Sequence, residues 1–228
     1  FMATIEGLRV DEKGNLLDIA KVTTSEGLAI YALPLETFPN HQNNVYVIDH
    51  PEWPTLIDVG TRGSHQQLLE SFATLRGEWG VELDINDVRL AFITHGHGDH
   101  FGNAHAIREL GIPLVMHQQA AYTLRSLPHR LPLYRRHLGL SGRRAGYSAE
   151  LVRTMVEAPF FDFDSLEADQ LVGDGDTIGD GWELTFVPGH APGQLVLAVD
   201  DVLFTADHLL SRITPAQGPA SRQPGMGL

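Results

Sequence analysis

Short apolar runs separated by turn-forming residues fill the first part of the chain. The runs at residues 28–33, 44–48 and 55–59 are rich in β-branched and aromatic side chains, which predicts three strands. A helix is then predicted from Ser64, whose side chain can cap it, because apolar residues recur at helical spacing. The residues of that apolar stripe are Leu68, Leu69, Phe72 and Leu75.

The next segment alternates between strands and helices. Apolar runs at 88–94 and 113–116 predict buried strands, and residues 99–110 between them predict a helix that ends at Gly111. This alternation of strands and helices is typical of a layered α/β domain.

Helix-like pieces broken by proline and glycine follow, and strand-like runs return after Asp169. The helical pieces are 118–126, 131–138 and 149–156, and the later strands are 182–187, 195–199 and 202–204. We therefore predict a single domain over residues 1–228, with a helical insert or lid at 118–168.

Composition narrows the class of protein. A length of 228 residues with 43% hydrophobic residues suits one packed domain. The net charge of −13 disfavours a nucleic-acid partner, because phosphates are neutralised by Lys and Arg. No apolar run reaches the ~18 residues of a membrane-spanning helix, and early charges interrupt any signal peptide, so we expect a cytoplasmic protein without a membrane partner. The absence of cysteine leaves His, Asp and Glu as metal ligands.

The strongest chemical signal is the sequence THGHGDH at residues 94–100. It follows a predicted buried strand and opens a predicted helix. Side chains two residues apart in extended backbone point the same way, so His95 and His97 can converge on one point, while Asp99 and His100 face a second. Imidazole and carboxylate ligands suit Zn²⁺ and can also hold Fe. Taken singly, Asp99 fits a helix cap and each His fits a solvated surface residue, but the cluster favours a metal site.

Two further potential ligands follow strands later in the chain. His190 comes after a Pro-Gly turn beyond the run at 182–187, and Asp207 comes beyond the run at 202–204. Loops that a rigid scaffold positions commonly carry functional side chains. Alone, each residue is as well explained by a turn or a surface position; together with residues 95–100 they predict one shared site.

These motifs resemble those of the metallo-β-lactamase superfamily of metallo-hydrolases, and the glyoxalase II-like branch in particular, over about residues 33–215. The motifs are LIDVG at 56–60, HxHxDH at 95–100, PGH at 188–190 and TAD at 205–207. The resemblance implies a four-layer αβ/βα sandwich with a helical insert. It also implies that the C-terminal part is missing, because members with two metal ions take a further His late in the chain and no His follows His208.

The resemblance assigns roles to individual residues. It implies a first metal ion held by His95, His97 and His190, a second held by Asp99 and His100, and Asp207 bridging both. Asp58 would orient the ligands from behind, as residues around metal-bound His generally do. Two Zn²⁺ per chain are expected if the complete protein supplies the further His, and iron is the alternative metal.

The implied reaction is hydrolysis of a carbonyl substrate by a zinc-bound hydroxide that Asp99 orients. The expected substrate is a thioester or ester, as in hydroxyacylglutathione hydrolases, although a lactonase or β-lactamase uses the same site. Mononuclear-iron persulfide dioxygenases look alike over these motifs, and an inactive truncated relative is a further alternative. The ligands do not choose among these functions, because one scaffold hosts many chemistries.

A basic stretch gives the clue to the substrate. Residues 120–149 contain six Arg and no acidic residue. Within this stretch, Tyr134, Arg135 and Arg136 are predicted to contact a small-molecule partner, an anionic acyl thioester held through phosphate or carboxylate. A solvated helical surface whose Arg side chains pair with acids elsewhere explains the charge equally well. The sequence indicates no particular oligomeric state.

Overall fold

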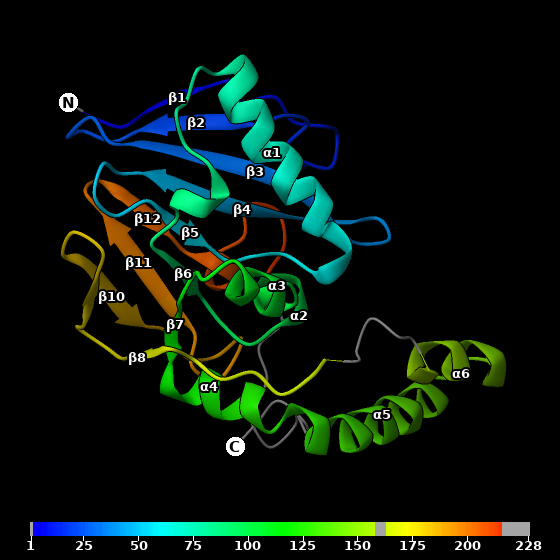
Figure 1. Cartoon of the computed structure of the whole chain (residues 1–228). Helices are drawn as coiled ribbons and strands as arrows, with labels where there is room; N and C mark the ends of the chain where they lie inside the picture. Colours follow the sequence, from blue (N-terminus) through cyan, green and yellow to red (C-terminus); the bar gives the residue numbers. More distant parts are fainter. Residues whose placement is uncertain (1, 158–162, 216–228) are drawn as a thin grey trace.

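Residues 2–157 and 163–215 are described by the computed structural model of the chain (Figure 1). Their strands form two sheets. The larger sheet has eight strands in chain order: β1 (Thr4–Glu6), β2 (Ala20–Thr23), β3 (Ala29–Phe38), β4 (His41–Asp49), β5 (Thr55–Ile57), β6 (Leu90–Ile93), β7 (Leu114–His117) and β8 (Gln170–Val172). Neighbouring strands from β1 to β5 are antiparallel, whereas those from β5 to β8 are parallel.

The smaller sheet is antiparallel throughout and has the order β12-β11-β10-β9. Its strands are β9 (Thr177–Ile178), β10 (Trp182–Phe186), β11 (Leu195–Val199) and β12 (Val202–Phe204). The α-helices are α1 (His65–Glu78), α2 (Gly98–Phe101), α3 (Ala104–Glu109), α4 (Gln118–Arg125), α5 (Leu127–Arg144) and α6 (Ala149–Glu157). Short 3₁₀ turns are η1 (Arg62–Ser64), η2 (Ile85–Asp87) and η4 (Ala206–His208).

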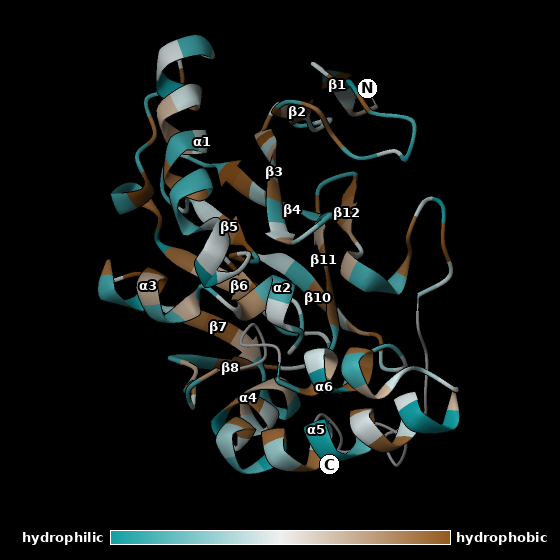
Figure 2. Ribbon diagram, turned by 90° about the vertical axis from the view of Figure 1, so that its right-hand side faces the viewer, coloured by the Kyte–Doolittle hydropathy of each residue, from teal (hydrophilic) through white to brown (hydrophobic). Residues whose placement is uncertain are grey.

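Alternating side chains of the large sheet build two hydrophobic cores. In β6, Ala91 and Ile93 belong to the core formed with the helices, whereas Leu90 and Phe92 belong to the core formed with the small sheet. All four residues are buried, which explains the continuous apolar run in the sequence. Helices α1 to α4 supply apolar side chains to the first core, and strands β9 to β12 supply them to the second. Figure 2 shows the hydrophobic colour concentrated on central strands such as β6 and β7.

The layered α/β fold predicted from the sequence is confirmed. Helices, large sheet and small sheet form three layers within the described residues, and the predicted strands correspond to β3 to β7 and β10 to β12. The sequence did not predict β1, β2, β8 or β9. These strands have two to four residues and little or no alternation between buried and exposed positions, so no periodic signal marks them.

Two helix predictions differ from the structure. Residues 99–110 form two helices instead of one, because the N–H of Asn103 donates to the carbonyl oxygen of Gly60 instead of continuing the hydrogen bonds of α2. Helix α5 instead runs without a break through Pro132. Both Pro128 and Pro132 are exposed, so water can bond to the carbonyl group that the missing Pro132 N–H leaves unpaired.

Helix α5 is the longest helix of the described residues, with 18 residues. It contains five arginines, Arg130, Arg135, Arg136, Arg143 and Arg144. Across the described part of the chain, no helix combines the length and the apolar character that crossing a lipid bilayer requires.

Substitution of Phe92 by Ala is expected to lower the free energy of unfolding by about 3–5 kcal/mol, because the side chain is fully buried between the two sheets. Leu203→Ala in β12 is the matched control, since Leu203 is 55% exposed. Its effect should stay below about 0.5 kcal/mol. Urea unfolding followed by circular dichroism measures both values. Equal, small changes in the two variants would contradict a hydrophobic core between the sheets.

Candidate metal centre

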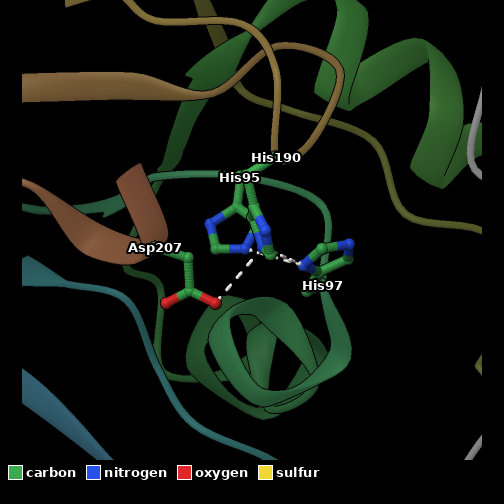
Figure 3. A group of neighbouring side chains, drawn as sticks. All are labelled: His95, His97, His190 and Asp207. Atoms are coloured by element: carbon green, nitrogen blue, oxygen red, sulfur yellow. Dashed lines mark hydrogen bonds and ion pairs between the residues drawn. The ribbon is translucent and has the colours of Figure 1, made fainter. Parts of the chain in front are cut away.

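Three segments that follow strands bring the predicted ligands together. His97, in extended backbone, lies between β6 and α2. His190 lies in the loop between β10 and β11, directly after Gly189, whose φ of 143° is a conformation that residues with a side chain rarely adopt. Asp207 lies in η4, which follows β12. Figure 3 shows the side chains of His95, His97, His190 and Asp207 pointing toward one another.

The ring nitrogens of three histidines meet at one point. The Nδ1 atom of His97 lies 3.0 Å from Nε2 of His95 and 2.8 Å from Nε2 of His190. An oxygen of Asp207 lies 3.2 Å from the same His190 nitrogen, and one ligand atom of each of the four residues lies within 4.8 Å of the others. One Nδ1 atom cannot hydrogen-bond well to two imidazole nitrogens at once, because a ring nitrogen carries either one N–H or one in-plane lone pair. A cation among these atoms satisfies all four lone pairs, so the residues fit a metal ion.

The protonation states of the cluster also fit a metal ion. Burial, followed by the nearby His100 and His97, holds the pKa of His95 well below its usual value. Burial and the neighbouring His190 lower the pKa of His97 to about 4. Burial alone would raise the pKa of Asp207, but hydrogen bonds from His100 and His190 keep that pKa well below its usual value. At neutral pH His95 and His97 are therefore neutral imidazoles and Asp207 is a carboxylate, the forms that bind metal ions.

A second group of potential ligands lies on the other side of Asp207. The Nε2 atom of His100 is 3.5 Å from Oδ1 of Asp207 and 3.5 Å from Oδ2 of Asp99. The two oxygens of Asp207 therefore face different groups, one at His190 and one at His100. Burial lowers the pKa of His100, but the carboxyl groups of Asp58, Asp207 and Asp99 outweigh it and raise that pKa well above its usual value. A cation bound there would displace the His100 proton.

Asp58 contacts His100 directly and His95 through the Thr94 hydroxyl, on the side of the histidine rings opposite the candidate metal positions. Its carboxyl group accepts hydrogen bonds from the backbone N–H and the hydroxyl of Thr94, and its Oδ2 lies 2.7 Å from Nδ1 of His100. Since the Thr94 hydroxyl donates to Asp58, it accepts from Nδ1 of His95 at 3.0 Å. In both histidines the Nδ1–H is thus engaged, which leaves Nε2 for a metal ion. Asp58 lies where the resemblance predicts a residue that orients the ligands.

His41 and Asn43 also reach the centre, although sequence reasoning did not select them. The Nε2 atom of His41 lies 3.1 Å from Oδ2 of Asp99, and Nδ2 of Asn43 lies 3.0 Å from Nε2 of His100. Burial raises the pKa of Asp99, but the hydrogen bond with His41 and the charge of His100 lower it overall, so Asp99 is ionised at neutral pH. The two residues alternate on β4 and so share one face. The spacing of two residues between His41 and Asn43 could have indicated that both side chains face the same way. No sequence motif, however, connected these two residues with the candidate metal ligands.

The three residues that were predicted to contact the substrate have different surroundings in the structure. Tyr134 lines a cavity of about 170 Å³ that His97 and Asp99 also line. Arg135 is half-buried and Arg136 is exposed, and neither lines this cavity. The structure thus brings Tyr134, but neither Arg side chain, to the wall next to the candidate metal centre.

The layered α/β fold and the His/Asp cluster at the strand ends define a metal-binding α/β protein. Residues 39–226 match the Metallo-beta-lactamase superfamily, and the chain belongs to that superfamily. Members of this superfamily typically bind metal ions, in agreement with the cluster found here. No curated protein matches the sequence significantly.

Solved structures with the same fold include a metallo-beta-lactamase family protein from Thermus thermophilus, at 21% identity and a TM-score of 0.62 over 86% of this chain and 66% of that one. A subclass B3 metallo-beta-lactamase of Bradyrhizobium japonicum has 22% identity and a TM-score of 0.52 over 77% and 58% of the two chains. The metallo-beta-lactamase FEZ-1 from Legionella gormanii has 15% identity and a TM-score of 0.52 over 74% and 53%. The present chain therefore spans between 53% and 66% of the length of these proteins. At these identities the likeness shows the fold, and the glyoxalase II-like branch stays a prediction.

Asp58→Asn is expected to lower the affinity for Zn²⁺ by about 10- to 100-fold, because an amide has one acceptor atom where the carboxylate has two. Asn tolerates the φ of 58° at this position, so the change isolates the carboxyl group. Isothermal titration calorimetry with Zn²⁺ measures the affinity.

The matched control is Asp200→Asn, which makes the same change at a similar φ of 51° in the turn between β11 and β12. Asp200 accepts a hydrogen bond from Thr24 and contacts none of the candidate ligands in the described residues. Its affinity for Zn²⁺ should equal that of the unchanged protein. An equal loss in both variants would contradict the positioning role of Asp58.

Proposed function

We propose that this protein is a metal-dependent hydrolase that cleaves an ester or thioester bond. The observation that carries the proposal is the convergence of imidazole nitrogens and a carboxylate beside the Asp99–His100 pair. In this proposal His95, His97, His190 and Asp207 would hold a first ion, and Asp99, His100 and Asp207 would hold a second. When bound, Zn²⁺ lowers the pKa of a water molecule to about 7 and polarises a carbonyl group.

The protein's own residues orient the reactants. Asp99 is ionised and lies on the wall of the cavity, where its carboxylate can accept a hydrogen bond from the attacking water. His41 contacts Asp99 and so fixes the direction of that carboxylate. The buried bond between Asp58 and His100 keeps the Nε2 atom of His100 facing the site. The wall of the cavity beside Asp99 includes the rings of Phe38, Phe101, Phe163 and Tyr134, which offer few polar partners that compete with that carboxylate.

An anionic acyl thioester is the substrate that we propose. The support is the basic character of α5, which contains five arginines and no acidic residue. At the start of this helix, the guanidinium group of Arg130 lies 5.2 Å from the ring centre of Tyr122, so part of this charge already stacks on an aromatic side chain. Arg136 is exposed and can reach a carboxylate or phosphate of the carrier.

Removal of metal with a chelator is expected to abolish hydrolysis, and added Zn²⁺ is expected to restore it, because the ligands supply no nucleophile of their own. The measurement is the rate of release of thiol or nitrophenol from a panel of thioesters, esters, lactones and β-lactams, together with the metal content of the protein. Circular dichroism serves as the control that the metal-free chain stays folded. Full activity without metal would overturn the proposal, and one iron per chain with consumption of O₂ would favour the persulfide dioxygenase.

The double variant Arg135→Glu with Arg136→Glu is expected to raise KM for an anionic thioester by at least tenfold, equivalent to about 1.4 kcal/mol of binding. The matched control is Arg143→Glu with Arg144→Glu, which reverses the same charge at the far end of α5. Steady-state kinetics of all three proteins gives the comparison. A KM that stays constant would show that these side chains form a solvated surface, and an equal rise in both variants would show a general effect of net charge.

A further inference from the structure

An apolar cavity opens beside the candidate metal centre. Its volume is about 170 Å³, and its wall includes the loop at Gly96, His97, Gly98 and Asp99. The remaining lining residues are Phe38, Phe101, Leu127, Leu131, Tyr134 and Phe163. Three of these are phenylalanines and two are leucines, and neither arginine of the predicted substrate contacts is among them. The cavity is thus continuous with the candidate ligands His97 and Asp99 but has a hydrophobic wall.

The side of the cavity next to α2 is closely packed. The rings of Phe101 and Phe163 lie 4.8 Å apart between their centres. A Cβ atom on Gly98 would lie 2.7 Å from the Phe163 ring, and one on Gly102 would lie 3.0 Å from it. These two glycines therefore let Phe163 approach the metal-binding motif and form part of the apolar wall of the cavity.

Helix α5 forms the opposite side of the cavity. Leu127, Leu131 and Tyr134 stand at positions i, i+4 and i+7, which lie on one face of a helix. Leu133 and Arg136 are exposed, in agreement with their place on another face. The helix therefore presents apolar side chains to the metal centre and a charged side chain to solvent.

We propose that this cavity is an acyl subsite that holds an uncharged, apolar acyl group of about six carbon atoms while its carbonyl group lies at His97 and Asp99. This inference rests on the proposed function and names the part of the substrate that the site selects. A dry cavity of about 150 Å³ is large enough for benzene, so about 170 Å³ accommodates a group of similar size. A charged acyl group is excluded, because a wall of phenylalanine and leucine side chains cannot compensate a buried charge.

The test compares nitrophenyl esters from acetate to decanoate. The value of kcat/KM is expected to rise about fourfold for each added methylene, the ratio that burial of one CH₂ group provides. The rise should stop at about six carbon atoms, where the cavity is full. A flat profile in an active enzyme would overturn the acyl subsite and leave the proposed hydrolase intact.

A pair of variants on α5 locates the effect. Leu131→Trp fills the cavity and is expected to shift the preferred ester to two carbon atoms, with at least a tenfold loss for the hexanoate ester. Leu133→Trp makes the same change two residues away, on a side chain that is 56% exposed, and should keep the original profile. Leu131→Phe is a smaller filling that gives an intermediate profile if the tryptophan variant does not fold. Equal profiles of the Leu131 and Leu133 variants would overturn the assignment.

Calorimetry with 1-hexanol on the metal-free protein tests the cavity without any hydrolysis. Binding by the unchanged protein and by Leu133→Trp, together with its loss in Leu131→Trp, supports the subsite. Absence of binding in the unchanged protein would overturn it. If hexanol binds in this manner but no ester is hydrolysed under any metal, the proposed function fails separately from the apolar subsite.

Discussion

One buried carboxyl group orients a histidine in each of the two ligand groups. Asp58 is 4% exposed, and it accepts hydrogen bonds from Thr94 at the end of β6 and from His100 in α2. Through the hydroxyl of Thr94 it also sets the ring orientation of His95. A buried carboxylate without such partners would be costly, so the segment after β5 that carries Asp58 and the two segments that supply its donors cannot move independently. The ring orientations of His95 and His100, one histidine from each ligand group, follow from this constraint.

The two hydrophobic cores hold the strands from which the candidate ligands extend. β6 is buried on both faces, and its residues alternate between the core under the helices and the core between the sheets. The histidines directly after β6 therefore start from a backbone that is held on both sides, whereas His190 and Asp207 come from the small sheet on the far side of one core. Packing between the sheets thus determines whether the four ligand atoms lie close together. Hydrogen bonds act only over short distances and cannot bring the two sheets together by themselves.

The sequence allowed the candidate ligands to be predicted because each follows a strand and most lie within one short motif. Residues 95–100 need only local spacing, and His190 and Asp207 each follow an apolar run. His41 and Asn43 could not be predicted in this way, since their contacts with Asp99 and His100 span more than fifty residues and depend on how the β3–β4 hairpin folds over α2. Short strands such as β1 and β9 were missed for a related reason: their pairing partners, rather than their own sequences, make them strands.

In helix α5 the composition indicates the charge of a substrate, whereas the position of each residue around the helix axis determines which side chains face the metal centre. Its composition is strongly basic, which favours an anionic partner, but a count of arginines does not say which residues face the metal centre. The phase places Leu127, Leu131 and Tyr134 on the cavity wall and leaves Arg136 exposed. An acyl thioester has both properties, an apolar acyl end and a charged carrier end. The two faces of one helix can therefore contact the two ends of such a substrate, with the carbonyl group between them at the metal centre.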